Sequence, residues 1–110
     1  MQMPFAEISP TQYTGRRQQG WEPLFIDTRN DMEASIVTLP DTDLLIPHEE
    51  ILLVNLPKDR DIVLYCRTGG RSAMAAYALS QSGHDSSKLF NLEGGIHAWH
   101  SEIDSSILKY

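Results

Sequence analysis

The only cysteine of this 110-residue chain, Cys66, opens the stretch Cys-Arg-Thr-Gly-Gly-Arg-Ser. Consecutive glycines permit backbone conformations that turn several N–H groups toward one point, and such a concave nest binds anions. Two arginines in the stretch add fixed positive charge beside it. These groups favour a thiolate, so we expect the pKa of the Cys66 thiol to lie below its usual range. A lone cysteine is otherwise most often a small buried hydrophobic residue, and that structural alternative competes with a nucleophilic role.

The elements expected on either side of Cys66 favour the nucleophilic role. Residues 62–65 form a continuous apolar run that predicts a buried strand, and a helix is expected over 72–82. Ligands bind at the carboxyl ends of strands in open α/β sheets, where the start of the next helix adds its positive dipole end. We therefore expect Cys66 to be a nucleophile whose anion-binding loop consists of Arg67, Thr68, Gly69, Gly70, Arg71 and Ser72.

Apolar runs and helical patterns alternate along the rest of the chain. Further strands are expected over 5–8, 24–27, 44–46 and 89–92. Further helical stretches are expected over 10–19, 31–36, 48–55 and 96–103, the first of them after a capping pattern that begins at Ser9. The alternation predicts one α/β domain over residues 1–110, with a mostly parallel sheet of about five short strands and helices on both faces. The sequence leaves open whether the tail over 104–110 is ordered.

Charge and composition narrow the classes of function. The net charge of −6 argues against binding to a nucleic-acid backbone, which calls for clustered basic residues. No apolar run approaches the roughly 18 residues that span a bilayer, and the N-terminal stretch lacks the basic start and apolar core of a signal peptide. We therefore expect neither a nucleic-acid nor a membrane partner. A single cysteine forms no internal disulfide and indicates a reducing compartment, so a cytoplasmic location is expected.

Two charged residues and two histidines are the remaining candidates. Asp27 and Arg29 lie at the end of a predicted strand, where an ion pair that supports the loop from below is favoured over a catalytic role. His97 and His100 have a spacing that fits a metal on a helix, but no cysteine or acidic cluster joins them. We therefore expect no metal site and no cofactor.

Three segments resemble the rhodanese-type sulfurtransferases. Residues 66–72 are similar to the active-site loop of that family, 26–29 (IDTR) to its Asp-Val-Arg strand end, and 92–99 to its closing Gly-Gly-x-x-x-Trp segment. The resemblance implies a single rhodanese-like domain in which Cys66 carries a persulfide. We expect Arg71 and the loop N–H groups to hold that persulfide. Arg67 is either a residue that steers anionic donors to the site or a solvated surface arginine.

A narrower likeness points to the C-terminal rhodanese domain of molybdopterin-synthase adenylyltransferase/sulfurtransferases. It rests on residues 44–47 (LLIP) and on the tail over 99–110. In those proteins the domain supplies sulfur for a thiocarboxylate on a small carrier protein. This implies a sulfur-carrier protein or an adenylating enzyme as a partner. The chain has no adenylating domain, so it is expected to be a stand-alone relative or a fragment.

One departure from the family pattern concerns residues 37–42 (VTLPDT), which stand where the family usually carries Gly-His-Ile-Pro-Gly-Ala. That element shapes the entry of a strand and borders the site. Its loss bears on substrate contacts more than on the chemistry of the cysteine.

The expected activity is a two-step sulfur transfer with ping-pong kinetics. Cys66 would take sulfur from a small anionic donor such as thiosulfate, or from a protein persulfide, and pass it to an external acceptor, because no second cysteine exists to resolve it. Two alternatives stay open. A phosphatase or arsenate reductase of related fold would need a loop longer than the four residues that separate Cys66 from Arg71. A non-catalytic rhodanese-like docking module is the other alternative, and the retained cysteine and arginines argue against it.

Overall fold

The computed structural model describes residues 2–110, and its centre is one sheet of five strands. All neighbouring strands run parallel, in the order β1-β5-β4-β2-β3. Their bounds are Ala6–Ile8 (β1), Leu24–Asp27 (β2), Leu44–Leu45 (β3), Ile62–Tyr65 (β4) and Leu89–Leu92 (β5). The predicted α/β domain with a parallel sheet of short strands is confirmed.

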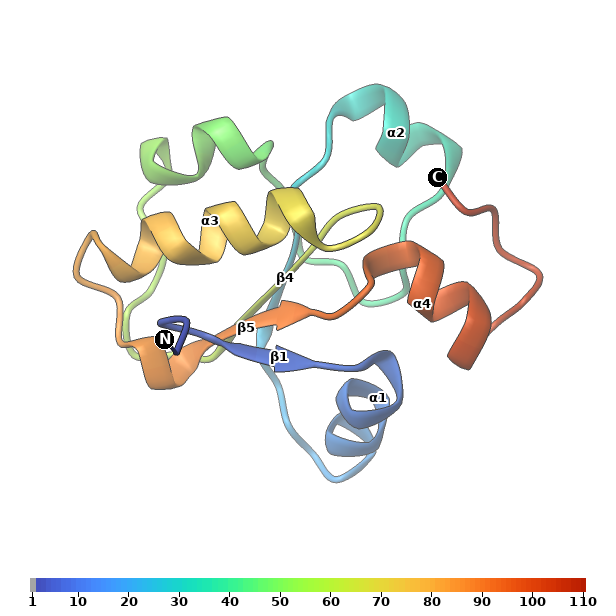
Figure 1. Ribbon diagram of the computed structural model, residues 1–110, viewed down its shortest axis with the longest axis horizontal. Helices are drawn as coiled ribbons and strands as arrows, with labels where there is room; N and C mark the ends of the chain where they lie inside the picture. The colour runs from blue at the N-terminus through green and yellow to red at the C-terminus, as the bar shows by residue number, and fades with distance from the viewer. Residues whose placement is uncertain (1) are drawn as a thin grey trace.

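Helices cover both faces of the sheet (Figure 1). The α-helices are Pro10–Gln18 (α1), Asp31–Ile36 (α2), Gly70–Ser80 (α3) and Gly95–Glu102 (α4), and the 3-10 helices are His48–Leu53 (η1) and Ser86–Lys88 (η2). One half of the core lies between the sheet and α3 and η1, through Leu79 and Ile51. The other half lies between the sheet and α1 and α4, through Tyr13 and Trp99. None of the helices in the described part of the chain is long and apolar enough to cross a membrane.

Alternate residues of the central strand β4 enter the two halves of the core. Ile62 and Leu64 face α3 and η1, whereas Val63 and Tyr65 face α1 and α4. All four side chains are fully buried. A strand that is covered on both sides has apolar residues at successive positions. For this reason the apolar runs in the sequence predicted β2, β4 and β5 with their observed bounds.

A reciprocal cap fixes the start of α1. The Ser9 hydroxyl accepts a hydrogen bond from the Gln12 N–H (3.1 Å), and the Gln12 side chain accepts one from the Ser9 N–H (2.9 Å). The predicted capping box is therefore confirmed. The helical stretch predicted over 48–55 is present as the 3-10 helix η1, which ends at Leu53.

The start of α3 differs from the prediction in a way that shapes the cysteine loop. The helix begins at Gly70, two residues before the predicted start at 72. Gly69 precedes it with a φ of +105°, a left-handed conformation that residues with a side chain rarely adopt. The irregular loop is consequently short, and Arg71 and Ser72 belong to the first turn of the helix.

The C-terminal tail lies against α4 and borders the cysteine loop. Ile107 packs against the half of the core under α1 and α4, and its carbonyl accepts a hydrogen bond from His100 Nδ1 (2.8 Å). The carbonyl of Lys109 lies 3.2 Å from Nε2 of His97, and the ring of Tyr110 lies beneath the guanidinium of Arg67, 5.0 Å from its carbon to the ring centre. The two ends of the chain lie apart, with the C-terminus close to α2 in the view of Figure 1.

Candidate active site

The thiol of Cys66 lies at the carboxyl end of β4, inside the loop that leads into α3. The residue is only 1% exposed. The N–H of Gly69 donates to Sγ at 3.1 Å, and the hydroxyl of Ser72 lies 3.4 Å from the same atom. The predicted loop therefore places hydrogen-bond donors around the sulfur, at the end of the sheet where ligands bind in open α/β folds.

Burial and the hydrogen-bond donors shift the pKa of the Cys66 thiol in opposite directions. Burial is the largest single influence and raises the pKa of Cys66, because it disfavours the charged form. A hydrogen bond from the Ser72 hydroxyl, when its proton is directed to the sulfur, and the backbone N–H groups of Ser72, Gly69 and Thr68 act in the opposite direction, and together they hold the pKa below its ordinary value. This is the direction expected from the sequence. A thiol of this kind is available as a nucleophilic thiolate at a lower pH than a free cysteine.

The back of the loop is held by the start of α4. The carbonyls of Cys66 and Arg67 accept hydrogen bonds from the N–H groups of Ile96 and His97, both at 3.1 Å. Gly95 makes this approach possible, since a Cβ on it would lie only 2.3 Å from the Cys66 carbonyl oxygen. In the sequence Gly94 and Gly95 belong to the segment 92–99 that resembles a family motif, and nothing in that pattern indicates that they support the cysteine.

The guanidinium of Arg71 makes an ion pair with Glu33 of α2. Its two terminal nitrogens donate to the two carboxylate oxygens, each at 2.8 Å. Arg71 is near enough to Cys66 for the two charges to influence each other. The hydrogen bonds from Arg71 lower the pKa of Glu33 to about 2. The predicted role of Arg71 at the persulfide thus has a competing partner that sequence reasoning missed, although Glu33 was visible as the third residue after Asn30, in a capping box.

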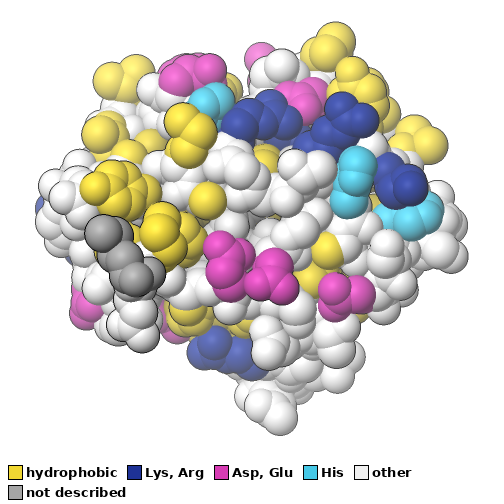
Figure 2. Space-filling model, in the orientation of Figure 1, with side chains coloured by type: hydrophobic (Ala, Val, Ile, Leu, Met, Phe, Trp, Pro, Cys, Tyr) yellow, Lys and Arg dark blue, Asp and Glu magenta, His cyan; other side chains and the backbone are white. Residues whose placement is uncertain are grey.

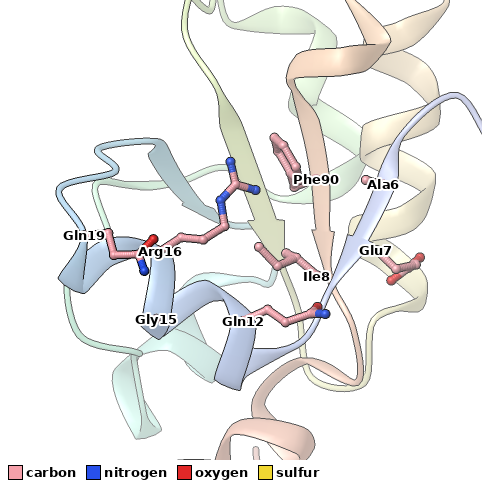
Figure 3. Close-up of a pocket in the computed structure, with 8 residues that line it drawn as sticks. All are labelled: Ala6, Glu7, Ile8, Gln12, Gly15, Arg16, Gln19 and Phe90. Atoms are coloured by element: carbon pink, nitrogen blue, oxygen red, sulfur yellow. The ribbon is translucent and has the colours of Figure 1, made fainter.

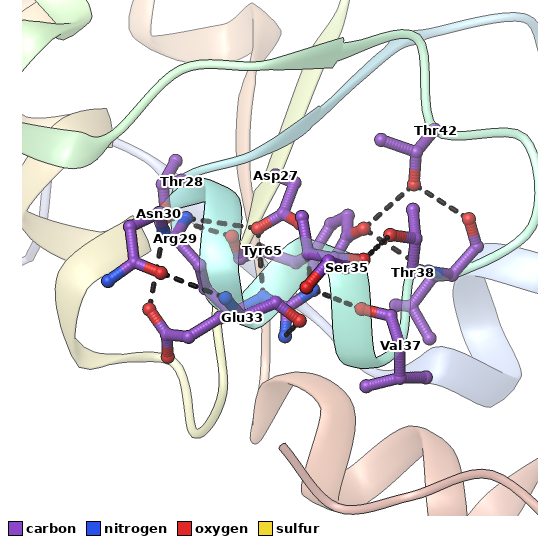
Figure 4. A network of polar contacts seen from close by, with 12 residues as sticks. Asp27, Thr28, Arg29, Asn30, Glu33, Ser35, Val37, Thr38, Thr42 and Tyr65 are labelled. Atoms are coloured by element: carbon purple, nitrogen blue, oxygen red, sulfur yellow. Dashed lines mark hydrogen bonds and ion pairs between the residues drawn. The ribbon is translucent and has the colours of Figure 1, made fainter.

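Asp27 and Arg29 form the expected ion pair, and it is fully buried (Figure 4). Arg29 donates to Asp27 through Nε (3.0 Å) and a terminal nitrogen (2.8 Å), and it also donates to the carbonyls of Glu33 (3.3 Å) and Val37 (2.6 Å). The pair thereby ties the end of β2 to α2 and to the segment after it. The carbon of the Arg29 guanidinium lies 5.9 Å from the ring centre of Tyr65, the residue before Cys66, so the pair approaches the cysteine loop through that ring.

The segment 37–42, which departs from the family pattern, packs against the residue before the cysteine. The hydroxyl of Tyr65 accepts a hydrogen bond from the N–H of Leu39 (3.3 Å) and pairs with the hydroxyl of Thr42 (2.8 Å). Burial is the main reason that the pKa of Tyr65 rises to about 12. The carbonyl of Tyr65 in turn accepts from Thr28 N–H (2.9 Å) and Oγ1 (2.8 Å). The segment therefore anchors the end of β4 without the usual family residues.

The mouth of the loop is formed by exposed residues. Arg67 and Thr68 are exposed, and Nε of Arg67 lies 3.4 Å from Nε2 of His97. Figure 2 shows basic side chains and histidines gathered on the part of this face that lies over α2, α4 and the start of α3. A negatively charged chain thus presents local positive charge where the thiol is reached.

A groove elsewhere in the fold is separate from this site. It lies between α1 and the edge of the sheet, and Figure 3 labels the eight residues that line it. Phe90 and Ile8 form its floor on the side of the sheet that faces α1. None of the predicted site residues lines it.

Comparisons with known proteins agree with this geometry. Residues 9–102 match the sequence pattern of the Rhodanese-like domain, and the chain belongs to this family. A protein named Sulfurtransferase from Allochromatium vinosum is 37% identical over 94 residues, which cover 84% of this chain and 86% of the relative. A crystal structure of a rhodanese-like domain protein from Staphylococcus aureus superposes with a TM-score of 0.77 at 26% identity, covering 94% of this chain and 97% of the other.

A third relative confirms the narrower likeness. The probable adenylyltransferase/sulfurtransferase MoeZ of Mycobacterium tuberculosis is 36% identical over 107 residues, covering 94% of this chain but 26% of the relative. The chain therefore spans about a quarter of MoeZ. Relatives that carry the name sulfurtransferase support a sulfurtransferase-type role for this domain.

Proposed function

We propose that this domain carries sulfane sulfur as a persulfide on Cys66, from a small anionic donor such as thiosulfate, or from a protein persulfide, to an external thiophilic acceptor. The observation that carries the proposal is the cradle around Sγ. A buried thiol that receives a backbone N–H at 3.1 Å, at the end of a central strand, is in a position where its anion is stabilised, which supports a nucleophilic role over simple packing as a hydrophobic residue.

The chemistry balances without a cofactor. The Cys66 thiolate attacks the outer sulfur of thiosulfate, a new S–S bond forms, and sulfite leaves with the electron pair of the bond that breaks. The persulfide anion then rests among the loop N–H groups. An acceptor such as cyanide attacks the outer sulfur, leaves as thiocyanate, and returns Cys66 to the thiolate. Since the chain has no second cysteine, the acceptor comes from outside it.

The match to MoeZ supports a protein acceptor in the cell. We propose a sulfur-carrier protein, or the adenylating enzyme that activates it, because MoeZ is named both adenylyltransferase and sulfurtransferase. The exposed Arg67 at the mouth suits an acceptor or donor that ends in an anionic group.

Intact mass spectrometry tests the persulfide directly. After incubation with thiosulfate we expect a mass gain of one sulfur atom, which cyanide removes with formation of thiocyanate. Cys66→Ser is the control, and it should show neither the gain nor thiocyanate formation. A folded protein that gains no sulfur from thiosulfate or from a low-molecular-weight persulfide would contradict the proposal and favour the docking module.

A further inference from the structure

A chain of polar contacts runs from the sulfur to the edge of the sheet. Ser72 Oγ, 3.4 Å from Sγ of Cys66, donates to Oδ1 of Asn91 at 2.5 Å. The side-chain nitrogen of Asn91 donates to both carboxylate oxygens of Glu7, at 3.0 and 3.1 Å. Ser72 is fully buried and Asn91 is 3% exposed, so solvent does not replace the contact between them, whereas Glu7 at the outer end is exposed. Neither Asn91 nor Glu7 has a part in the site described above.

The orientation of the Asn91 amide is fixed by its neighbours. Its nitrogen faces three oxygens that only accept, two from Glu7 and the carbonyl of Gly69 at 3.2 Å. Turning the amide over would place its oxygen against a carboxylate and a carbonyl, with no hydrogen between them. Figure 3 shows the Glu7 side chain on the opposite side of β1 from Ile8, which is the side of Asn91 and α3. Oδ1 of Asn91 is therefore left to face Ser72.

This orientation creates a competition for one proton. The Ser72 hydroxyl has a single hydrogen to donate, and three acceptors lie near it: Oδ1 of Asn91, the carbonyl of Gly69 at 3.3 Å and the Cys66 thiolate. The Gly69 carbonyl already accepts from the N–H of Ala73 (3.1 Å) and from the side-chain nitrogen of Asn91 (3.2 Å), so the competition lies between Asn91 and the sulfur. The contact to Asn91 is the shorter of the two. A donation to Asn91 leaves the thiolate with the backbone N–H groups alone, whereas a donation to sulfur leaves Oδ1 buried without a partner, which is costly.

Most charged groups around the loop are paired with one another. The hydrogen bond from the Ser72 hydroxyl is therefore the contact that can change the acidity of the Cys66 thiol. The charged and titratable groups of the surrounding elements are Glu7 of β1, Asp27 and Arg29 at the end of β2, Glu33 of α2, Arg67, Arg71 of α3, and His97 of α4. Arg71 is paired with Glu33, and Arg29 with Asp27. Burial raises the pKa of Glu7, although its bonds to Asn91 oppose this.

We propose that Asn91 is a positioning residue that holds the proton of Ser72 away from the sulfur and so keeps the Cys66 thiol less acidic than the loop alone would make it. The inference rests on the proposed function only in taking Cys66 as the nucleophile. A less acidic thiol would be useful in a sulfur carrier because of its reactivity. A thiolate loses nucleophilicity as the pKa of its thiol falls, and attack is fastest when that pKa is near the ambient pH.

A double-mutant cycle on the free protein tests this. The pKa of Cys66 is measured from the ultraviolet absorbance of the thiolate, with Cys66→Ser as the baseline, and from the pH dependence of alkylation by iodoacetamide. Asn91→Leu should lower that pKa by about half a unit or more, because Ser72 becomes free to donate to sulfur. Ser72→Ala should raise it. In the Ser72→Ala background, Asn91→Leu should produce no shift.

The opposite outcomes overturn the inference. If Asn91→Leu leaves the pKa unchanged or raises it, Asn91 does not compete with the sulfur. An equal shift in both backgrounds shows that Asn91 acts without Ser72. Asn91→Ala serves if the leucine variant fails to fold, and Glu93→Gln, which removes an acid near Glu7 that has no contact with Asn91, is the matched control. Because no sulfur donor is used, a failure of persulfide loading contradicts the proposed function and leaves this measurement intact.

Discussion

Gly95 shows how one residue without a side chain can support a reactive group on another element. Its φ is +56°, and a Cβ there would lie 2.3 Å from the Cys66 carbonyl oxygen and 2.8 Å from the carbonyl atoms of Arg67. The loop is thus backed by direct contact between two backbones. The loop around Cys66 therefore depends on this distant glycine as well as on Gly69, the loop glycine with a positive φ.

Replacing this glycine should damage both the fold and the site. Gly95→Ala forces the start of α4 away from the loop, and we expect a loss of about 2–4 kcal/mol in the free energy of unfolding together with slower alkylation of Cys66. Gly15→Ala is the matched control, because a Cβ at Gly15 meets nothing within 4 Å in the middle of α1. That control should raise stability by up to about 1 kcal/mol. Urea unfolding measures both, and equal effects of the two variants would contradict the account.

At the scale of elements, the short helix α2 is attached to the site by one ion pair and a hydrogen bond from an arginine more than by apolar packing. Met32 and Ile36 on this helix are exposed, whereas Glu33 is buried and binds Arg71 of α3. Arg29 adds a bond to the Glu33 carbonyl. The position of α2 beside the cysteine loop therefore depends on charge.

This attachment predicts a pH dependence. The folded protein holds the pKa of Glu33 at about 2, below its ordinary value of 4.5. The stabilisation is therefore fully present above about pH 4.5 and is lost as the pH falls toward 2. We expect Glu33→Gln to lower the free energy of unfolding by about 1–3 kcal/mol at neutral pH and to match the wild type near pH 2. Denaturant titrations over this range measure the difference, and a constant gap between the proteins at all pH values would refute the assignment.

Elements with a local signal were predictable, and contacts between distant elements were not. Residues that are adjacent in the chain determine the cap at Ser9 and the apolar runs of β2, β4 and β5. The start of α1 and the bounds of these strands could therefore be predicted from the sequence. The pairing of Arg71 with Glu33 depends on how two helices are placed beside one another, which no local pattern specifies.

Candidate site residues divide in the same way. Cys66 and its loop stood out because the glycines, arginines and strand end are adjacent in the chain. Asn91 could have been noticed as a single polar residue inside the apolar run of β5, but its partner Glu7 lies at the other end of the sequence and only the parallel pairing of β1 with β5 brings them together. The early start of α3 was missed because Gly69 and Gly70 look alike in sequence, while only Gly69 has the positive φ.

At the scale of the whole molecule, the net negative charge of the chain repels anions, whereas the positive charge of Arg67 at the mouth of the cysteine loop attracts them. The net charge is −6, yet Arg67 is exposed beside the loop. Positive charge within a Debye length of the thiol raises the local concentration of anions, and salt screens the effect.

Two alkylating reagents of different charge separate this field from thiol reactivity. Arg67→Ala should slow the reaction of Cys66 with anionic iodoacetate by about 2- to 5-fold at low salt and leave the reaction with neutral iodoacetamide unchanged. The difference should shrink as salt is added. Arg60→Ala is the control, because Arg60 precedes β4 and so lies toward the opposite end of the sheet from the thiol. Equal effects of the two substitutions on iodoacetate would show that Arg67 contributes only to net charge and would leave it a solvated surface arginine.

The support of the cysteine loop by β5 and α4 has a consequence for folding during synthesis. Every group that closes the back of the loop, from Asn91 to Ile96 and His97, is translated after Cys66. While these residues are still inside the ribosome, the carbonyls of Cys66 and Arg67 lack the backbone hydrogen bonds that they accept from α4 in the folded protein. The donors to the sulfur lie in the loop and at the start of α3, but the bonds that hold this loop from behind form only after α4 has left the ribosome, so we expect the cysteine loop to reach its final geometry late in synthesis.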